Sequence, residues 1–482
     1  MTTDPHINVA QAWEGLDLPA SEHAERRLGH IHLVGIGGIG MSGIAEVLLT
    51  LGYSVTGSDL QESDATKRLA GMGASIAVGH DENNVDDSTE VVVISSAVDD
   101  ANPEVRAARR LRVPVIPRAE MLAELMRVKC GVAVAGAHGK TTTTSLVAAV
   151  LGQGGFDPTL VIGGRLKSLG GTNARLGRSR YMVAEADESD GSFLLLKPTV
   201  AVVTNIDREH MTYYGNMERL VDAYVAFING IPFYGRAVLC TDCSEIRSLL
   251  PRLKKRYTTY GTDASADLRA VEITQQGVST TFDVVARGAV LGKVQVHLPG
   301  THFVLNSLAA IAVGLEFGVS FDDCAAALGA FDGIMRRFEV KGEAAGVTVV
   351  DDYAHHPTEI RATLAAARSA YPERRIVAVF QPHRYTRTLD LFKEFTTAFE
   401  HADLVVVTDI YAAGETPAEG IDGRSLAEAV RRLHRGQVVY EPAGAALAGR
   451  AAALAHPGDL LLTLGAGDVT KLGPEILARL AR

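Results

Sequence analysis

Two glycine-rich segments limit what this chain can fold into, because each lies between an apolar strand and a helical stretch. The first, Gly-Ile-Gly-Gly-Ile-Gly, occupies residues 35–40, and the second, Gly-Ala-His-Gly-Lys-Thr, occupies residues 136–141. Glycines permit a tight turn after a strand and let the N–H groups at the start of a helix approach a phosphate closely. Both segments therefore predict α/β domains that bind a nucleotide.

The same alternation of apolar strand, polar turn and helical stretch continues along the chain, and it predicts parallel sheets with helices on both faces. A chain of 482 residues suits roughly three domains. We expect an N-terminal extension at 1–29, a Rossmann-like domain at 30–128, a central P-loop ATPase-type domain at 129–336 and a C-terminal Rossmann-like domain at 337–482. Strands are expected near 31–35, 54–57, 91–95, 113–116, 132–135, 181–184, 199–203, 347–350, 376–380, 404–408 and 460–464.

Composition narrows the class of protein. The net charge of −10 disfavours binding to nucleic acid or to acidic membranes. No apolar run approaches the roughly 20 residues that span a bilayer, and the first thirty residues do not resemble a secretory signal. Cys240 and Cys243 have the spacing of a redox or metal pair, but no second pair follows, which favours structural thiols. We expect a cytoplasmic protein.

The first glycine segment is compatible with two kinds of ligand. Its glycines, Gly35, Gly37, Gly38 and Gly40, could bind a pyrophosphate, and Asp59 stands where a carboxylate would bind a ribose. Taken alone, this pattern is typical of an NAD-dependent oxidoreductase. A UDP-sugar offers the same pyrophosphate and ribose, so the segment predicts a nucleotide without deciding which one.

The second glycine segment predicts an ATP site. Its backbone amides and Lys140 could bind the phosphates, and the Thr141 hydroxyl could bind Mg²⁺. The loop is shorter than the usual P-loop, with two residues between its glycines instead of four. A dehydrogenase has no use for this second site, so the two loops together suggest phosphoryl activation of a nucleotide-linked substrate. The expected ATP-binding residues of this loop are Gly136, His138, Gly139, Lys140, Thr141 and Thr142.

Acids and histidines follow the neighbouring strands of the central domain. Glu185 ends one strand, and His210 follows the next. In a parallel sheet these strand ends share an edge with Lys140, and carboxylates there suit Mg²⁺. We expect Glu185 to bind one ion and His210 a second. The alternatives are a solvated acidic turn at 185–190 and a structural histidine.

Two strand ends in the C-terminal domain carry a second cluster of polar side chains. One strand ends in Asp351-Asp352-Tyr353-Ala354-His355, and another is followed by His383, Arg384 and Arg387. Arginines at a strand end can bind a carboxylate or phosphate through two parallel hydrogen bonds. The cluster predicts a ligand site, and the alternative is an exposed basic loop.

In their order, these segments resemble those of the Mur ligases over nearly the whole chain. The resemblance is strongest to the branch that adds L-alanine to UDP-N-acetylmuramate. It implies an ATP-dependent carboxylate–amine ligase that works through an acyl phosphate in peptidoglycan precursor synthesis, with ATP and Mg²⁺. The matching segments are 35–43, 136–144, 185–192, 204–210, 351–358, 380–388 and 464–468.

The resemblance also implies roles for individual residues. Lys140, His210, Arg337, Asp352 and His355 would be catalytic, with His355 taking the amine proton. The UDP-substrate site would include Gly35, Gly37, Gly38, Gly40, Asp59 and Ser95. The metal ligands would be Thr141, Glu185 and His210, and the ATP site would also include His302, Asn306, Arg337 and Asp352. The amino-acid pocket would be formed by Tyr353, His355, His383, Arg384 and Arg387.

Two features depart from the patterns of other family members. Phe303 stands where the family usually has an asparagine near the adenine, and no lysine lies between Lys197 and Lys254, where later ligases of the pathway carry a carbamylated one. The second departure fits the alanine-adding branch.

Three other functions remain open on the sequence alone. They are a relative that joins a whole tripeptide to the same UDP-sugar, an NAD-dependent oxidoreductase, and a nucleotide sensor without catalysis. We expect a monomer or homodimer whose C-terminal domain closes when nucleotide binds.

Overall fold

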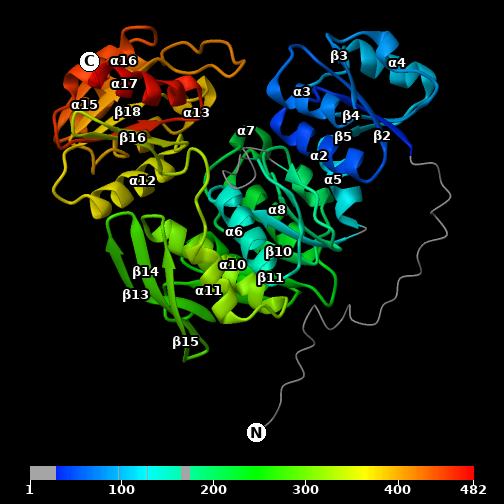
Figure 1. The fold of residues 1–482 in the computed structure, drawn as a ribbon, viewed down its shortest axis with the longest axis horizontal. Helices are drawn as coiled ribbons and strands as arrows, with labels where there is room; N and C mark the ends of the chain where they lie inside the picture. Colours follow the sequence, from blue (N-terminus) through cyan, green and yellow to red (C-terminus); the bar gives the residue numbers. More distant parts are fainter. Residues whose placement is uncertain (1–28, 96, 128, 164–173) are drawn as a thin grey trace. The chain divides into compact units, whose positions relative to one another are not determined.

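The computed structural model describes residues 29–95, 97–127, 129–163 and 174–482, so the expected N-terminal extension lies outside it except for Gly29 (Figure 1). The chain forms two compact units. One runs through Val271 and includes residues 283–294 and 305–331, and the other holds residues 272–282, 295–304 and 332–482. Within the described ranges, no helix is both long and apolar enough to cross a membrane.

The N-terminal sheet is parallel and has the order β3-β2-β1-β4-β5. The chain runs from β1 outward to β2 and β3 and then crosses back to β4 on the other side of β1, so a switch point lies at the ends of β1 and β4, where ligands bind in such sheets. Its elements are β1 (His30–Val34), α2 (Ile39–Thr50), β2 (Ser54–Asp59), α3 (Asp64–Gly71), β3 (Ser75–Val78), β4 (Thr89–Ile94), α4 (Pro103–Leu111), β5 (Val115–Pro117) and α5 (Arg118–Arg127).

The central sheet has the order β15-β14-β13-β12-β11-β10-β6-β9-β7-β8. Strand β6 is buried along its length between its parallel neighbours β9 and β10, so the loops after these three strands meet at one edge. The strands are β6 (Cys130–Ala135), β7 (Thr159–Val161), β8 (Ala174–Arg175), β9 (Tyr181–Glu185), β10 (Val200–Val203), β11 (Arg236–Cys240), β12 (Tyr257–Gly261), β13 (Leu268–Gln276), β14 (Ser279–Ala286) and β15 (Ala289–Val296). The helices are α6 (Lys140–Gln153), α7 (Met211–Tyr214), α8 (Met217–Asn229), α9 (Ser244–Leu249), α10 (Thr301–Glu316) and α11 (Phe321–Gly329).

The C-terminal sheet has the order β16-β17-β21-β18-β19-β20, and it is parallel except for the edge strand β16. Apolar side chains of its strands pack with those of α16 and α17 in one core. The strands are β16 (Glu339–Ala344), β17 (Val347–Asp352), β18 (Ile376–Phe380), β19 (Leu404–Val407), β20 (Gln437–Tyr440) and β21 (Leu460–Leu464). The helices are α12 (Pro357–Ala370), α13 (Tyr385–Asp390), α14 (Phe392–Thr396), α15 (Gly423–Leu433), α16 (Leu447–Leu454) and α17 (Leu472–Leu480).

Successive parts of the chain form three sheets with helices between their strands, and this confirms the predicted α/β fold class. The sequence did not predict the edge strands β3, β16 and β20, the strands β7, β8, β11 and β12 of the central sheet, or its extension β13–β15. The domain boundaries at residues 128 and 336 stay predictions.

Candidate active site

The loop between β6 and α6 depends on its glycines. Gly136 has φ 132° and Gly139 has φ 80°, a backbone region that favours glycine. A Cβ at Gly136 would overlap the Thr204 hydroxyl, and one at Gly139 would lie 2.8 Å from Asn306 Oδ1. At Gly136 and Gly139 the loop has no room for a side chain, because Thr204 and Asn306 lie directly against its backbone.

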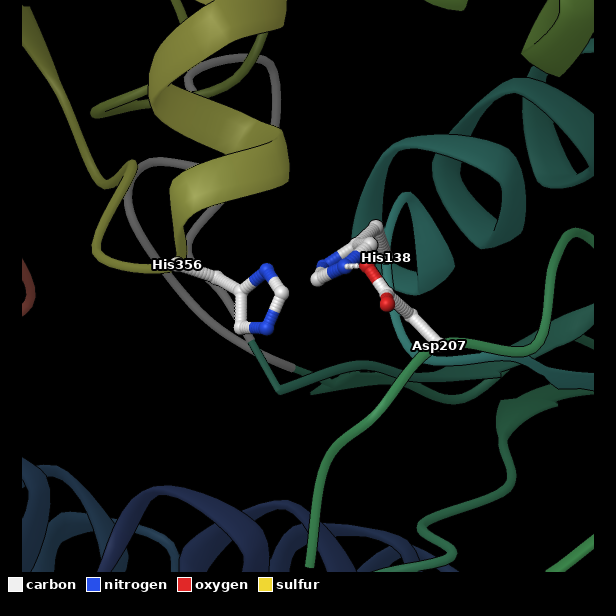
Figure 2. A group of neighbouring side chains, drawn as sticks. All are labelled: His138, Asp207 and His356. Atoms are coloured by element: carbon white, nitrogen blue, oxygen red, sulfur yellow. Dashed lines mark hydrogen bonds and ion pairs between the residues drawn. The ribbon is translucent and has the colours of Figure 1, made fainter. Parts of the chain in front are cut away.

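His138 is held by the loop that follows β10. Its N–H donates to Asn205 Oδ1 at 2.8 Å, and its carbonyl accepts from the Thr204 hydroxyl at 2.6 Å. The His138 ring is paired through Nε2 with Asp207 Oδ2 at 2.8 Å (Figure 2). Hydrogen bonds therefore join the glycine loop at 136–141 to the loop that follows β10.

Lys140 points to the acids at the same edge of the sheet. Its ammonium donates to Gly136 O at 2.6 Å and to both carboxylate oxygens of Glu188 at 2.9 Å. Burial disfavours the charged ammonium, but Glu188, Asp187 and Glu209 outweigh it and raise the pKa of Lys140. Burial likewise opposes ionisation of Asp187, yet Lys140 and hydrogen bonds from Ser189 lower the pKa of that carboxyl.

Three potential metal ligands gather beside this lysine. Ligand atoms of Glu188, Glu209 and His210 all lie within 4.8 Å of one another. His210 Nε2 is 3.6 Å from Glu188 Oε1 and 3.5 Å from Glu209 Oε2. Two carboxylates and an imidazole fit Mg²⁺ or Mn²⁺ by donor chemistry. Glu185, the ligand that the sequence favoured, is not one of these three, and it accepts from Gly163 N–H at 2.7 Å.

The remaining residues of this loop are buried at the start of α6. Thr141 and Thr142 are buried, and the Thr143 hydroxyl donates to Asn306 Oδ1 at 3.1 Å. Asn306 was expected near the adenine, and here its side chain supports the first turn of α6.

Cys240 and Cys243 are free thiols. Burial raises the pKa of both, that of Cys240 to about 12, which disfavours a reactive thiolate. Cys243 Sγ accepts from Ile206 N–H at 3.4 Å, so this thiol packs against the loop that carries Asp207.

The glycine loop of the N-terminal domain is fixed by the neighbouring strand. Gly35, with φ 76°, donates to Ser58 O at 2.8 Å, and Gly37 N–H donates to Asp59 Oδ2 at 2.8 Å. A Cβ at Gly37 would lie 2.8 Å from the same Asp59 oxygen. Asp59 therefore shapes the loop directly, in addition to the ribose contact expected of it.

Two further residues lie at this end of the N-terminal sheet. Ser95 follows β4, and its carbonyl accepts from Val98 N–H at 3.0 Å. The guanidinium of Arg118, at the start of α5, lies so close to the loop that a Cβ on Gly40 would be 3.0 Å from Nη1. Arg118 was not among the residues predicted for this site from the sequence.

A buried carboxylate organises the other side of this strand end. Glu104 accepts from the Ser58 hydroxyl at 2.7 Å and Asn84 Nδ2 at 2.6 Å, and it lies 3.1 Å from His80 and 3.6 Å from His32. Burial would raise its pKa, but bonds from His32, Asn84 and Ser58 hold that pKa below its ordinary value. This network was also missed by the sequence reasoning.

In the C-terminal domain, Asp352 pins the chain that enters the sheet. Its carboxylate accepts from Phe338 N–H at 2.7 Å and Ala354 N–H at 2.8 Å. Burial raises the pKa of Asp352 to about 6, against the opposing effect of Arg337. Asp352 thus has a structural role that the sequence did not indicate.

Asp351 and Arg336 form a second clamp on the same segment. Asp351 accepts from the Thr463 hydroxyl at 2.6 Å and the Thr470 hydroxyl at 2.7 Å, and lies 3.4 Å from Arg336 Nε. The Arg336 guanidinium also donates to the carbonyls of Gly465, Ala466 and Gly467.

The backbone on both sides of Arg337 is conformationally restricted. Arg336 has φ 61° and Phe338 has φ 45°, which side-chain-bearing residues rarely adopt.

The expected amino-acid pocket is a cluster of rings and guanidinium groups. His355 is 5.8 Å from His383, which stacks on Tyr411 at 5.5 Å. Arg387 Nη1 is 3.4 Å from His383 Nδ1. Burial, with the nearby His355 and Arg387, lowers the pKa of His383 to about 3, so this ring stays neutral near pH 7. Tyr411 was not expected here.

The other members of this cluster surround Tyr353. The guanidinium groups of Arg336 and Arg337 lie over its ring at 4.8 and 5.1 Å. His355 Nδ1 is 3.1 Å from Glu359 Oε2, and Arg384, with φ 69°, is the N-cap residue that precedes α13. Glu359 also completes the cap of α12 with His356, which is drawn in Figure 2.

His302 is at the start of α10. Desolvation, together with Arg337, lowers the pKa of His302 to about 4, so it is neutral at pH 7. Its ring contacts Phe303 at 4.3 Å, and Phe303 is buried in the core. The asparagine usual at this position is therefore replaced by a packing residue.

Sequence models of one family match three successive parts of the chain. The Mur ligase family catalytic domain matches residues 30–129, the Mur ligase middle domain residues 134–314, and the Mur ligase glutamate ligase domain residues 336–467. The chain belongs to the Mur ligase family. Members of the family are ATP-dependent, which agrees with the loop at Lys140.

Individual Mur ligases match over nearly their whole length. A UDP-N-acetylmuramate–L-alanine ligase from Pelobacter propionicus is 56% identical over 94% of this chain and 98% of its own. The crystal structure of UDP-N-acetylmuramate–alanine ligase from Thermotoga maritima matches with a TM-score of 0.77 and 30% identity, over 93% of this chain and 98% of that one. A murein peptide ligase from Psychrobacter arcticus shares the fold with a TM-score of 0.67 and 24% identity, over 94% and 99% of the two chains.

Proposed function

We propose that this Mur ligase joins L-alanine to the lactyl carboxylate of UDP-N-acetylmuramate at the expense of ATP, as a cytoplasmic step in peptidoglycan precursor synthesis. The observation that carries the proposal is the match to the Pelobacter propionicus ligase of that name, which includes almost all of both chains. The glycine loops at 35–40 and 136–141 supply the two nucleotide sites that such a reaction needs.

Activation of the carboxylate comes first, because oxide is a poor leaving group. A carboxylate oxygen attacks the γ-phosphorus of ATP, ADP leaves, and an acyl phosphate forms. The uncharged amine of L-alanine then attacks the acyl carbon, inorganic phosphate leaves, and the amide nitrogen gives up a proton. His355 is the proposed acceptor of this proton, and Glu359, 3.1 Å from its Nδ1, would stabilise the resulting imidazolium.

Binding of ATP is assigned to the central domain. The loop residues Gly136, His138, Gly139 and Thr142 and the ammonium of Lys140 are proposed to hold the phosphates, and His302, Asn306, Arg337 and Asp352 the rest of the nucleotide. Mg²⁺ bound through Thr141 and Glu185, with a second ion at His210, would offset the charge that develops on the phosphates.

Binding of the other two substrates is assigned to the outer domains. Gly35, Gly37, Gly38, Gly40, Asp59 and Ser95 are proposed to hold the UDP group. Tyr353, His355, His383, Arg384 and Arg387 are proposed to hold the amino acid, with the arginines paired to its carboxylate. The neutral His383 ring would not compete with them for that carboxylate.

The test is phosphate release with ATP, Mg²⁺ and UDP-N-acetylmuramate, with and without L-alanine. Release that needs both the sugar nucleotide and L-alanine supports the proposal. Release with the murein tripeptide but not with L-alanine would indicate a murein peptide ligase instead. No release with any amine would contradict a ligase.

A further inference from the structure

The ammonium of Lys140 is fully occupied within the structure. It donates to Gly136 O at 2.6 Å and to the two Glu188 oxygens at 2.9 Å, with Ala137 O a further acceptor at 3.3 Å. An ammonium has three protons. Lys140 therefore cannot bind a phosphate oxygen strongly until it gives up one of these acceptors.

Glu188 is the acceptor that is most costly to leave. Its side chain is only 2% exposed, and its carbonyl accepts from the Tyr214 hydroxyl at 2.6 Å, which fixes the backbone. A buried carboxylate that loses its cation is still removed from water, but it no longer has the electrostatic attraction that offset this desolvation. If Lys140 moves to the phosphates, another cation has to replace it at Glu188.

The neighbours of Glu188 are suited to a divalent cation. Glu209 and His210 each offer a ligand atom within 4.8 Å of the others, and the Glu209 and His210 side chains are 9% and 23% exposed. Carboxylate oxygens suit Mg²⁺, and Mn²⁺ also accepts an imidazole nitrogen. Of the three side chains, His210 is the most exposed to solvent.

We propose that the second of the two divalent cations, the one assigned to His210, is bound by Glu188 and Glu209 as well, and that Lys140 occupies Glu188 until that cation arrives. The metal takes over the carboxylate, and the released ammonium turns to the phosphates. The inference rests on the proposed function only in requiring a metal-bound nucleotide. It adds Glu188 to the residues of the reaction and couples Lys140 to metal binding.

The competing explanation is that Glu188 is a permanent counter-ion, which stays with Lys140 when the nucleotide binds. If Lys140 and the metal compete for Glu188, removal of the ammonium makes metal binding tighter, and the gain depends on Glu188. The two explanations differ in whether Glu188 binds metal while Lys140 and nucleotide are both present. A permanent counter-ion predicts that Glu188→Gln leaves metal binding unchanged under those conditions.

The experiment is a titration with Mn²⁺, followed by the loss of its free electron paramagnetic resonance signal, on the full chain without nucleotide. Lys140→Met should bind Mn²⁺ at least about fivefold more tightly than the unmodified protein, the low end of typical coupling between sites. Adding Glu188→Gln to this variant should abolish the gain. Lys197→Met and Glu218→Gln are the controls, because both residues are exposed on the same domain, and neither should change the affinity.

A second measurement does not depend on the lysine variant. With a non-hydrolysable ATP analogue present, Glu188→Gln should bind one Mn²⁺ fewer than the unmodified protein, or bind it at least about fivefold more weakly. Unchanged Mn²⁺ binding by Glu188→Gln in the presence of the analogue would overturn the proposal. Because neither titration contains L-alanine or UDP-N-acetylmuramate, a failure here is distinct from a failure of the proposed ligase activity.

Discussion

Asp352 should make the stability of the C-terminal domain depend on pH. Burial raises its pKa from 3.8 to about 6 in the folded protein, although Arg337 and two backbone N–H groups favour the ionised form. The unfolded chain has no such burial, so its carboxyl ionises near the ordinary value. The perturbation that isolates this effect is Asp352→Asn, which cannot ionise.

The sign follows from which state loses its proton first. As pH rises above about 4, the unfolded state ionises while folded Asp352 stays protonated, so folding loses stability until the pH passes the folded pKa of about 6. The difference between 3.8 and about 6 corresponds to about 3 kcal/mol, since each pH unit of difference is worth about 1.4 kcal/mol.

Urea unfolding of the full chain, followed by circular dichroism at several pH values, gives the comparison. The asparagine variant loses one good hydrogen bond to Phe338 or Ala354, and that loss is about the same at every pH. Relative to Asp352→Asn, the unmodified protein should therefore become about 3 kcal/mol less stable between about pH 4 and pH 7. A difference between the two proteins that stays constant across this range would refute the raised pKa. A matched Asp403→Asn variant, near the surface of the same domain, should not reproduce the effect.

Three further outcomes are expected. Gly136→Ala should lower ATP-dependent turnover by about 100-fold or more, measured by phosphate release, because its Cβ overlaps Thr204; unchanged turnover would contradict the loop geometry. Tyr411→Leu should raise the KM for L-alanine about 3- to 10-fold through loss of the stack on His383, while Tyr411→Phe should not; equal KM values would exclude a role in the pocket. Glu104→Ala should lower the free energy of unfolding by about 1–3 kcal/mol, seen in denaturant unfolding, and Glu104→Gln by less; no loss in either would argue against the buried network.

Much of the fold could be predicted because its central strands are buried on both faces and read as apolar runs. The segments 132–135 and 376–380 are examples, and both are central strands of parallel sheets. The edge strand at Ser75–Val78 was missed because its residues are exposed or half-buried and no apolar run marks it. An edge strand packs on few neighbours, so its sequence is less constrained.

The candidate site was predictable where backbone conformation demands glycine, and less so where partners come from distant parts of the chain. The sequence located Lys140 because the glycines and the following helix mark the loop. It did not single out Glu188, since nothing in the acidic run at 185–190 tells which side chain turns inward. Tyr411 reaches His383 through a bridge between segments 28 residues apart, which no local pattern indicates.

The clamps on Arg336 and Phe338 have a consequence for how the C-terminal domain can move. Arg336 is hydrogen-bonded to the loop at 465–467, and Phe338 to Asp352. From Arg336 onward, the chain therefore moves together with the C-terminal sheet as one rigid body. Any rotation of that sheet has to be taken up before this point, where Gly333, with φ 88°, is free of such bonds to Asp351 and Asp352. Arg337 lies within this rigid segment, so it would turn with the sheet and keep its place over Tyr353.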